Sequence, residues 1–227
     1  MSDAPDNSGH RARLRQRLFD GGSDALLDHE LIEYLLGLTI PRIDTKPLAK
    51  ALLREFGGIG ALLSADADAE AFRRLKVKPT SIAALKAAHA VALRLLRAEA
   101  MERPVLGNWQ ALLDYLHADM AHHAIERVRV LHLNSKNMLI RDELMHEGNV
   151  DEAAVYVRQV IRRAIDLQSA AIILVHNHPS GDPTPSRADI EITRNVAEAA
   201  KRLGIALHDH VIIGAHGHSS LRGLGLI

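Results

Sequence analysis

Two histidines and an aspartate stand close together where a strongly apolar segment gives way to a loop. His176 and His178 end the run AIILVHNH, and Asp189 follows in SRADI after a loop rich in proline and glycine. Residues two apart on a strand point to the same side, so both imidazoles face one place. Two imidazoles and one carboxylate leave the fourth position of a tetrahedral zinc open for water, as in catalytic zinc sites. The residues therefore predict a catalytic centre with one zinc ion per chain.

Ser186, three residues before Asp189, fits either a structural or a chemical role. Ser-x-x-Asp is typical of a helix start, where the serine caps the helix and the acid complements its dipole. By itself the pair favours the structural interpretation, with Ser186 as N-cap. Capping does not explain two imidazoles at the point where a buried strand opens into a loop. The combination favours a metal site.

Other histidines carry weaker signals. His208 and His210 begin a segment that continues into VIIG, with no acid downstream at the right distance, so we interpret them as ordinary strand residues. His122 and His123 stand at the expected end of a helix, where cations are favoured, and we give them the same structural interpretation.

The amino-acid composition excludes several classes of protein and several kinds of site. The chain has 227 residues, 28 acidic and 28 basic side chains, and no cysteine. Disulfides and cysteine-based zinc sites are excluded, and no global charge favours nucleic acid. No apolar run is long enough to span a bilayer, and the N-terminus lacks the apolar core of a signal peptide. We expect a cytoplasmic protein that has no membrane contact.

Two regions with different patterns are expected. Residues 11–97 are helical in pattern, with helices over 28–38, 44–65 and 79–101; the first is expected to begin with Asp28 as cap and to bury Leu31, Leu35 and Leu38. The segment MERPVLGNW ends this half, so we place domains at 1–103 and 104–227, divided at Arg103–Pro104.

The helical half resembles a helix-hairpin-helix unit in one place. Glycines at 57, 58 and 60 interrupt the second helix, and such turns let backbone N–H groups approach a phosphate. An ordinary break between packed helices explains the same spacing better. The second candidate hairpin, over residues 73–85, has Pro79 and no glycine. We therefore expect weak, salt-sensitive DNA contact by residues 1–103, or none.

The second half alternates helices and strands. Strands are expected over 126–134, 138–145, 170–178, 205–215 and 218–227, with helices over 108–121, 151–167 and 186–204. The segment AAIILVHNH is too apolar to face water on either side, which predicts a central strand. Glu126, Val128, Val130 and His132 are expected to share one strand face. The pattern predicts an α/β domain with helices packed on one sheet.

The segment HNHPSGDPTPSRAD fits the pattern H-x-H-x7-S-x2-D of the JAMM (JAB1/MPN) metalloproteases, with His176, His178, Ser186 and Asp189 on the named positions. The text around it resembles the bacterial RadC branch of that family, as do GHRARLRQRL, ELIEYLL and PRIDTKPLAKALLREFG in the first half. The resemblance implies a cytidine-deaminase-like α/β fold and zinc-dependent hydrolysis of peptide or isopeptide bonds in a protein or peptide substrate. It also implies that the motif serine helps to stabilise the oxyanion.

The resemblance further implies a glutamate outside the motif that acts as general acid and base. Glu126, Glu143 and Glu147 are the candidates. In JAMM proteins this glutamate begins the strand after the first helix of the domain, which selects Glu126. Glu143 lies in the return strand, where a charged side chain is expected to face water.

Two other functions compete with the hydrolase. One is a DNA-associated binding protein whose metal site is structural or vestigial, which the helix-hairpin-helix-like half and the family name motivate. The balanced charge argues against tight DNA binding. The other is zinc-dependent deamination, whose usual signature contains Pro-Cys-x-x-Cys and cannot occur in a chain without cysteine. The oligomeric state is left open.

Overall fold

A computed structural model of the chain describes residues 7–148 and 153–227. Its internal contacts divide it into two compact units, Met1–Ala92 and Leu93–Ile227. The division falls inside one long helix, α6 (Pro79–Met101), which was predicted with these bounds. The predicted domain boundary at Arg103–Pro104 lies just after the end of this helix. The two units are described separately below.

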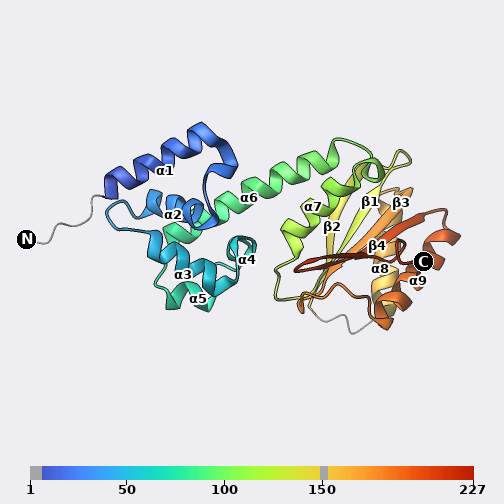
Figure 1. Cartoon of the computed structure of the whole chain (residues 1–227). Coiled ribbons are helices and arrows are strands. Elements are labelled where there is room, and N and C mark those ends of the chain that lie inside the picture. Colours follow the sequence, from blue (N-terminus) through green and yellow to red (C-terminus); the bar gives the residue numbers. More distant parts are fainter. Residues whose placement is uncertain (1–6, 149–152) are drawn as a thin grey trace, which may run out of the picture. The chain divides into compact units, whose positions relative to one another are not determined.

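The N-terminal unit is helical, as predicted (Figure 1). Its core is built from apolar side chains of α2, α3, α4 and α5 and the first half of α6, among them Ile32, Leu36 and Phe72. The predicted apolar face of α2 is wrong in part, because Leu38 is exposed while Ile32 and Leu36 are buried. Its helices are α1 (Asn7–Gly21), the 3-10 turn η1 (Gly22–Ala25), α2 (Asp28–Thr39), α3 (Lys46–Phe56), α4 (Ile59–Ser64) and α5 (Glu70–Arg74).

Two local details of this unit concern the sequence predictions. Asp28 is the first residue of α2 and Leu27 precedes it as N-cap, so the expected cap is wrong. The Glu30 carboxylate accepts the Leu27 backbone N–H at 3.0 Å and satisfies a donor that the helix leaves open. Between α3 and α4, Gly57 (φ 83°) and Gly58 (φ 148°) form the predicted break. Contact of this turn with DNA stays a prediction.

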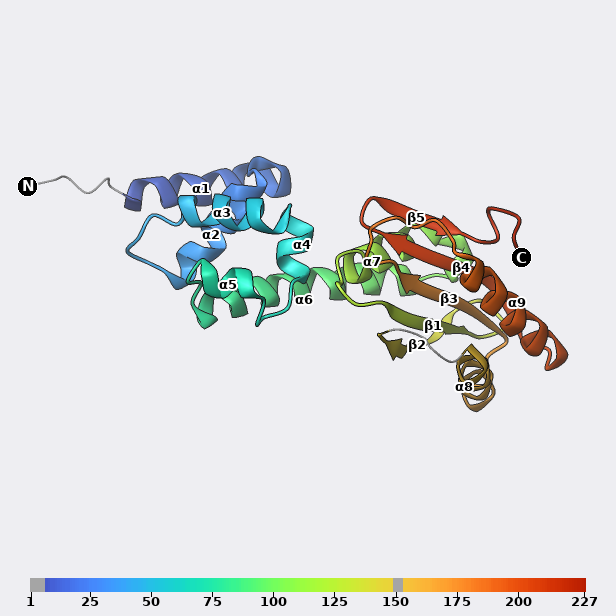
Figure 2. The ribbon, with the colours of Figure 1, turned by 90° about the horizontal axis from the view of Figure 1, so that it is seen from below.

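The C-terminal unit contains a five-stranded sheet in the order β2-β1-β3-β4-β5, which can be followed in Figure 2. Only β3 and β4 run parallel; the other neighbouring strands are antiparallel. The predicted long last strand is wrong, because β5 ends at Ser220 and turns follow. The elements are η2 (Val105–Gly107), α7 (Trp109–Met120), β1 (Arg127–Leu133), β2 (Leu139–Glu147), α8 (Ala153–Asp166), β3 (Ala171–Asn177), α9 (Arg187–Arg202), β4 (Ala206–Gly214) and β5 (Gly217–Ser220).

Helices cover both faces of the sheet. Helix α7 packs with Ile173 and Val175 of β3 on one face, and α8 and α9 pack with Ile172 and Leu174 on the other (Figure 1). Every residue of β3 is buried, which confirms the predicted central strand. In the described ranges no helix is long and apolar enough to cross a membrane.

An irregularity in β4 decides which of its side chains face α9. Ile172 pairs with Leu207, but the next residue of β3, Ile173, pairs with Asp209, so one residue of β4 is skipped. The skipped residue inverts the alternation of side chains along the rest of the strand. From there on His210, opposite Leu174, lies on the α8/α9 face, whereas Val211 joins the core under α7.

His132 is buried on the α8/α9 face of β1, away from solvent. Its Nδ1 lies 3.0 Å from the Ser169 hydroxyl, and its Nε2 lies 3.7 Å from the Glu143 carboxylate, which Arg163 of α8 binds. Burial lowers the pKa of His132 to about 4, although the Glu143 charge partly opposes that shift. The imidazole is therefore neutral in the folded protein at pH 7.

This burial makes stability depend on pH. The unfolded chain takes up a proton at His132 near its ordinary pKa of 6.5, whereas the folded protein does so only near 4. Stability is therefore lost as the pH falls from 6.5 towards 4. We expect the free energy of unfolding to fall less steeply with acid in His132→Gln than in the wild type. His216→Gln, at an exposed position, should show the wild-type dependence on pH. The free energy of unfolding of the C-terminal unit is measured at each pH by urea unfolding followed by Trp109 fluorescence, because Trp109 is the only tryptophan. An equally steep acid loss in His132→Gln would contradict the assignment.

Candidate metal centre

The structure brings together the three residues that were predicted to hold a metal. His176 lies in β3, His178 directly follows that strand, and Asp189 lies in the first turn of α9. The Nε2 atoms of the histidines are 3.0 Å apart, and they lie 3.3 Å and 3.5 Å from the two Asp189 carboxylate oxygens. This is the one group of histidine and acidic side chains, in the part of the chain that is described, whose ligand atoms could share a metal ion.

The distances between these atoms suit one small ion. A tetrahedral zinc has bonds of about 2.0 Å to nitrogen and oxygen, which places its ligand atoms about 3.3 Å from one another. The three separations, 3.0, 3.3 and 3.5 Å, bracket that value. The side chains are partly enclosed, with exposed fractions of 2% for His176, 18% for His178 and 14% for Asp189. The cluster could therefore hold a metal ion and leave one side open.

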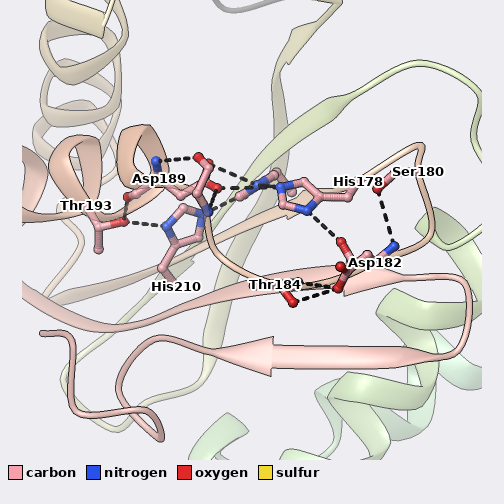
Figure 3. A network of polar contacts seen from close by, with 9 residues as sticks. His178, Ser180, Asp182, Thr184, Asp189, Thr193 and His210 are labelled. Atoms are coloured by element: carbon pink, nitrogen blue, oxygen red, sulfur yellow. Dashed lines mark hydrogen bonds and ion pairs between the residues drawn. The ribbon is translucent and has the colours of Figure 1, made fainter.

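A loop contact fixes the His178 ring. Its Nδ1 lies 2.8 Å from the backbone oxygen of Asp182 (Figure 3). A carbonyl oxygen only accepts, so Nδ1 donates and the Nε2 of the neutral ring is left with its lone pair. The loop is held against β4, where a Cβ added to Gly214 would lie 2.4 Å from the Gly181 oxygen. Only glycine at position 214 allows this close approach.

His210, which the sequence analysis interpreted as an ordinary strand residue, contacts the site directly. It does lie in β4, but its Nε2 is 2.8 Å from Nδ1 of His176. Its Nδ1 is 2.5 Å from the hydroxyl of Thr193 on α9, as Figure 3 shows. Burial holds the pKa of His210 well below its ordinary value, so the ring is neutral. The structural interpretation of His210 was therefore incomplete.

Asp189 has two tasks at the start of α9. Its carboxylate accepts the Ser186 backbone N–H at 2.7 Å, and its own N–H donates to the Ser186 hydroxyl at 3.1 Å. This reciprocal pair confirms the predicted cap. Burial alone would raise the pKa of Asp189, but the neighbouring His176 imidazole and the hydrogen bond from Ser186 outweigh it and hold that pKa below its usual range. The carboxylate is ionised at neutral pH and suits a cation. The Ser186 hydroxyl is exposed beside this carboxylate.

Glu126 lies on the same side of the sheet as the two histidines. It directly precedes β1, and Val128 pairs with His176 across the antiparallel β1/β3 ladder. Continuing this register by two residues places Glu126 opposite His178. The Asn177 amide continues the ladder at that point: its oxygen accepts the Arg127 N–H at 2.8 Å, and its nitrogen donates to the Ile125 oxygen at 3.2 Å. Asn177 thus holds the backbone on both sides of Glu126.

The three candidate glutamates differ in their partners. Arg163 binds the carboxylate of Glu143, and Arg127 lies 3.2 Å from that of Glu147. Glu143 faces α8 rather than water, contrary to the expectation for the return strand. Within residues 7–148 and 153–227, no cation pairs with Glu126. Its negative charge contributes to raising the pKa of the buried Tyr156 hydroxyl, mainly an effect of burial.

Three residues around the centre were not found from the sequence. Thr193 follows Asp189 by four residues on one helix, so helical spacing already placed it on the same face. Asn177 stands between the two histidines and points to the opposite face of β3. Nothing in the sequence marks His210 apart from its residue type, because its orientation depends on the irregularity in β4.

A family model described as the RadC-like JAB domain matches residues 106–226, more than half of the chain. The matched residues include the whole sheet, the helices α7, α8 and α9, and the cluster of His176, His178 and Asp189. The match agrees with the resemblance found in the sequence and with the α/β architecture of the C-terminal unit. This chain belongs to the RadC family of JAB-domain proteins.

Proposed function

We propose that the protein is a zinc-dependent hydrolase that cleaves peptide or isopeptide bonds in a protein or peptide substrate. The observation that carries this proposal is the convergence of two imidazole Nε2 atoms and the Asp189 carboxylate on one point, within 3.0–3.5 Å of one another. Membership of the JAB family supports metal-dependent hydrolysis in general. Three protein ligands, rather than four, favour a catalytic over a structural ion.

The zinc ion supplies two effects when bound: it lowers the pKa of a coordinated water to about 7, and it polarises a carbonyl oxygen. His176, His178 and Asp189 would hold the ion. The Asp182 carbonyl restricts the orientation of the His178 ring, and the cap at Ser186 restricts that of the Asp189 carboxylate. Such rigid support is what a catalytic metal centre needs.

Glu126 would move the proton. Hydrolysis of an amide needs a base that takes a proton from the attacking water and an acid that returns it to the leaving nitrogen. The carboxylates of Glu143 and Glu147 are already engaged by Arg163 and Arg127, which argues against either of them as the group that contacts an attacking water. Glu126 has no such partner among the described residues, and the β1/β3 register continued by two residues brings it opposite His178.

Ser186 would stabilise the negative charge that develops on the carbonyl oxygen of the substrate. Its hydroxyl oxygen accepts the Asp189 N–H, so the hydroxyl proton can point outwards. A donor aimed at such an oxygen typically contributes 10²–10³-fold to the rate, by order of magnitude. The exposed position of Ser186 beside Asp189 supports this role.

The metal content tests the ligand assignment first. We expect about one zinc per chain in the wild type. His176→Ala and Asp189→Ala each remove one of three ligands, so both variants should lose most of their zinc in elemental analysis. His218→Ala, at an exposed position on β5, is the matched control and should keep it. Wild-type zinc content in both ligand variants would show that the ion is bound elsewhere.

The proton shuttle is tested by an isosteric pair of variants. Glu126→Gln keeps the shape but cannot accept a proton, so hydrolysis should fall by about 10²–10⁴-fold with zinc content unchanged. Glu143→Gln should leave the rate nearly unchanged. Both are compared with wild type on a substrate selected from a peptide and isopeptide library. Full activity in Glu126→Gln together with a loss in Glu143→Gln would transfer the role to Glu143.

A further inference from the structure

A chain of buried hydrogen bonds connects two of the ligand candidates behind the metal centre. The Thr193 hydroxyl donates to the backbone oxygen of Asp189, one turn earlier in α9. The same hydroxyl oxygen lies 2.5 Å from Nδ1 of His210, and Nε2 of His210 lies 2.8 Å from Nδ1 of His176. Thr193, His210 and His176 are at most 3% exposed, so water does not compete for these contacts.

The direction of each hydrogen bond in this chain follows from the first. A backbone oxygen only accepts, so the single proton of the Thr193 hydroxyl is used on Asp189. The hydroxyl oxygen must then accept from His210, whose Nδ1 carries the proton. A ring with one proton has a lone pair on Nε2, and this lone pair accepts from Nδ1–H of His176. The remaining nitrogen of His176, Nε2, keeps its lone pair.

We propose that Thr193 and His210 are positioning residues that set the tautomer of His176 and so present its Nε2 lone pair to the metal. The inference rests on the metal centre of the proposed function. Because this series of hydrogen bonds starts at the Asp189 backbone and ends at His176, it also links the two ligand candidates that come from different elements, α9 and β3. Neither positioning residue touches the ion or the substrate.

This series of hydrogen bonds predicts what happens when the Thr193 hydroxyl, which accepts from His210, is removed. In Thr193→Val, Nδ1–H of His210 has no partner, and the ring gains by moving its proton to Nε2, which still faces His176. His176 must then accept at Nδ1 and carry its own proton on Nε2, where the metal would bind. Loss of such an outer support typically weakens metal binding about 10–100-fold. Thr193→Ser keeps the hydroxyl and should bind zinc as wild type does.

A purely packing role for His210 makes a different prediction. Asparagine at position 210 keeps a polar group near Thr193 but cannot reach His176, whereas the longer glutamine places its carbonyl oxygen near the original Nε2. If orientation of His176 matters, His210→Gln should retain zinc affinity and His210→Asn should lose it by a similar 10–100-fold. If only the filled volume matters, the smaller and the larger replacement should not separate in this way.

Two measurements on the full-length chain decide the matter. Zinc affinity of the wild type, Thr193→Val and Thr193→Ser is measured by competition with a chromophoric chelator, with Trp109 fluorescence as the check that each variant is folded. The ring nitrogens of His176 are observed by ¹H–¹⁵N correlation in chelator-treated protein, assigned by their loss in His176→Gln because the chain has 14 histidines. We expect Nδ1–H in wild type and Thr193→Ser, and Nε2–H in Thr193→Val.

The outcomes separate this inference from the proposed function. Unchanged affinity in Thr193→Val, or weaker affinity with the Nδ1–H form of His176 preserved, would overturn the positioning role while the metal centre stands. A wild-type protein whose zinc affinity is independent of His176 and Asp189 would instead overturn the metal centre. Weaker binding together with the change to Nε2–H supports the inference.

Discussion

The metal centre depends on one constraint: both imidazoles must direct Nε2, without a proton, at the same point. The Asp182 carbonyl imposes this on His178, and the contact with His210 does so on His176. Two nitrogen lone pairs 3.0 Å apart repel each other unless a cation lies between them or a proton is shared. The Asp189 carboxylate next to them adds a negative charge. A divalent cation bound at this point would offset both the repulsion between the lone pairs and the negative charge of the carboxylate.

This arrangement of side chains requires several strands and one helix to keep fixed positions relative to one another. The fully buried strand β3 carries His176 between β1 and β4, and neither neighbour can slip by one residue without turning buried side chains outwards. The β1 register pairs Val128 with His176 and, continued by two residues, brings Glu126 opposite His178, and the β4 irregularity turns His210 towards α9. Asn177 uses its amide where the β1/β3 ladder ends, so the backbone groups on both sides of Glu126 have hydrogen-bond partners there. The geometry of the candidate metal centre is thus a consequence of sheet register.

Much of this could be predicted from the sequence, and the failures have physical reasons. The three ligand candidates, the N-cap at Ser186 and the central strand follow from local spacing and apolar pattern, and the structure has them together. The role of His210 could not be predicted, because simple alternation along β4 fails where one residue is skipped. Nor could Asn177, whose partners come from a distant segment. At Asp28 the expected cap was wrong because the helix begins one residue earlier than expected, with Leu27 as N-cap and Asp28 as its first helical residue.

In the proposed function, two imidazoles and one carboxylate bind a zinc ion and leave its fourth position open. X-ray absorption at the zinc edge, on protein loaded with one equivalent of zinc, tests this most directly because it reports the number and kind of ligands. We expect four nitrogen or oxygen neighbours at about 2.0–2.2 Å, with the multiple scattering of two imidazoles and with one neighbour that exchanges for added anions. A spectrum with one imidazole, or with three or four imidazoles and no exchangeable neighbour, would contradict it.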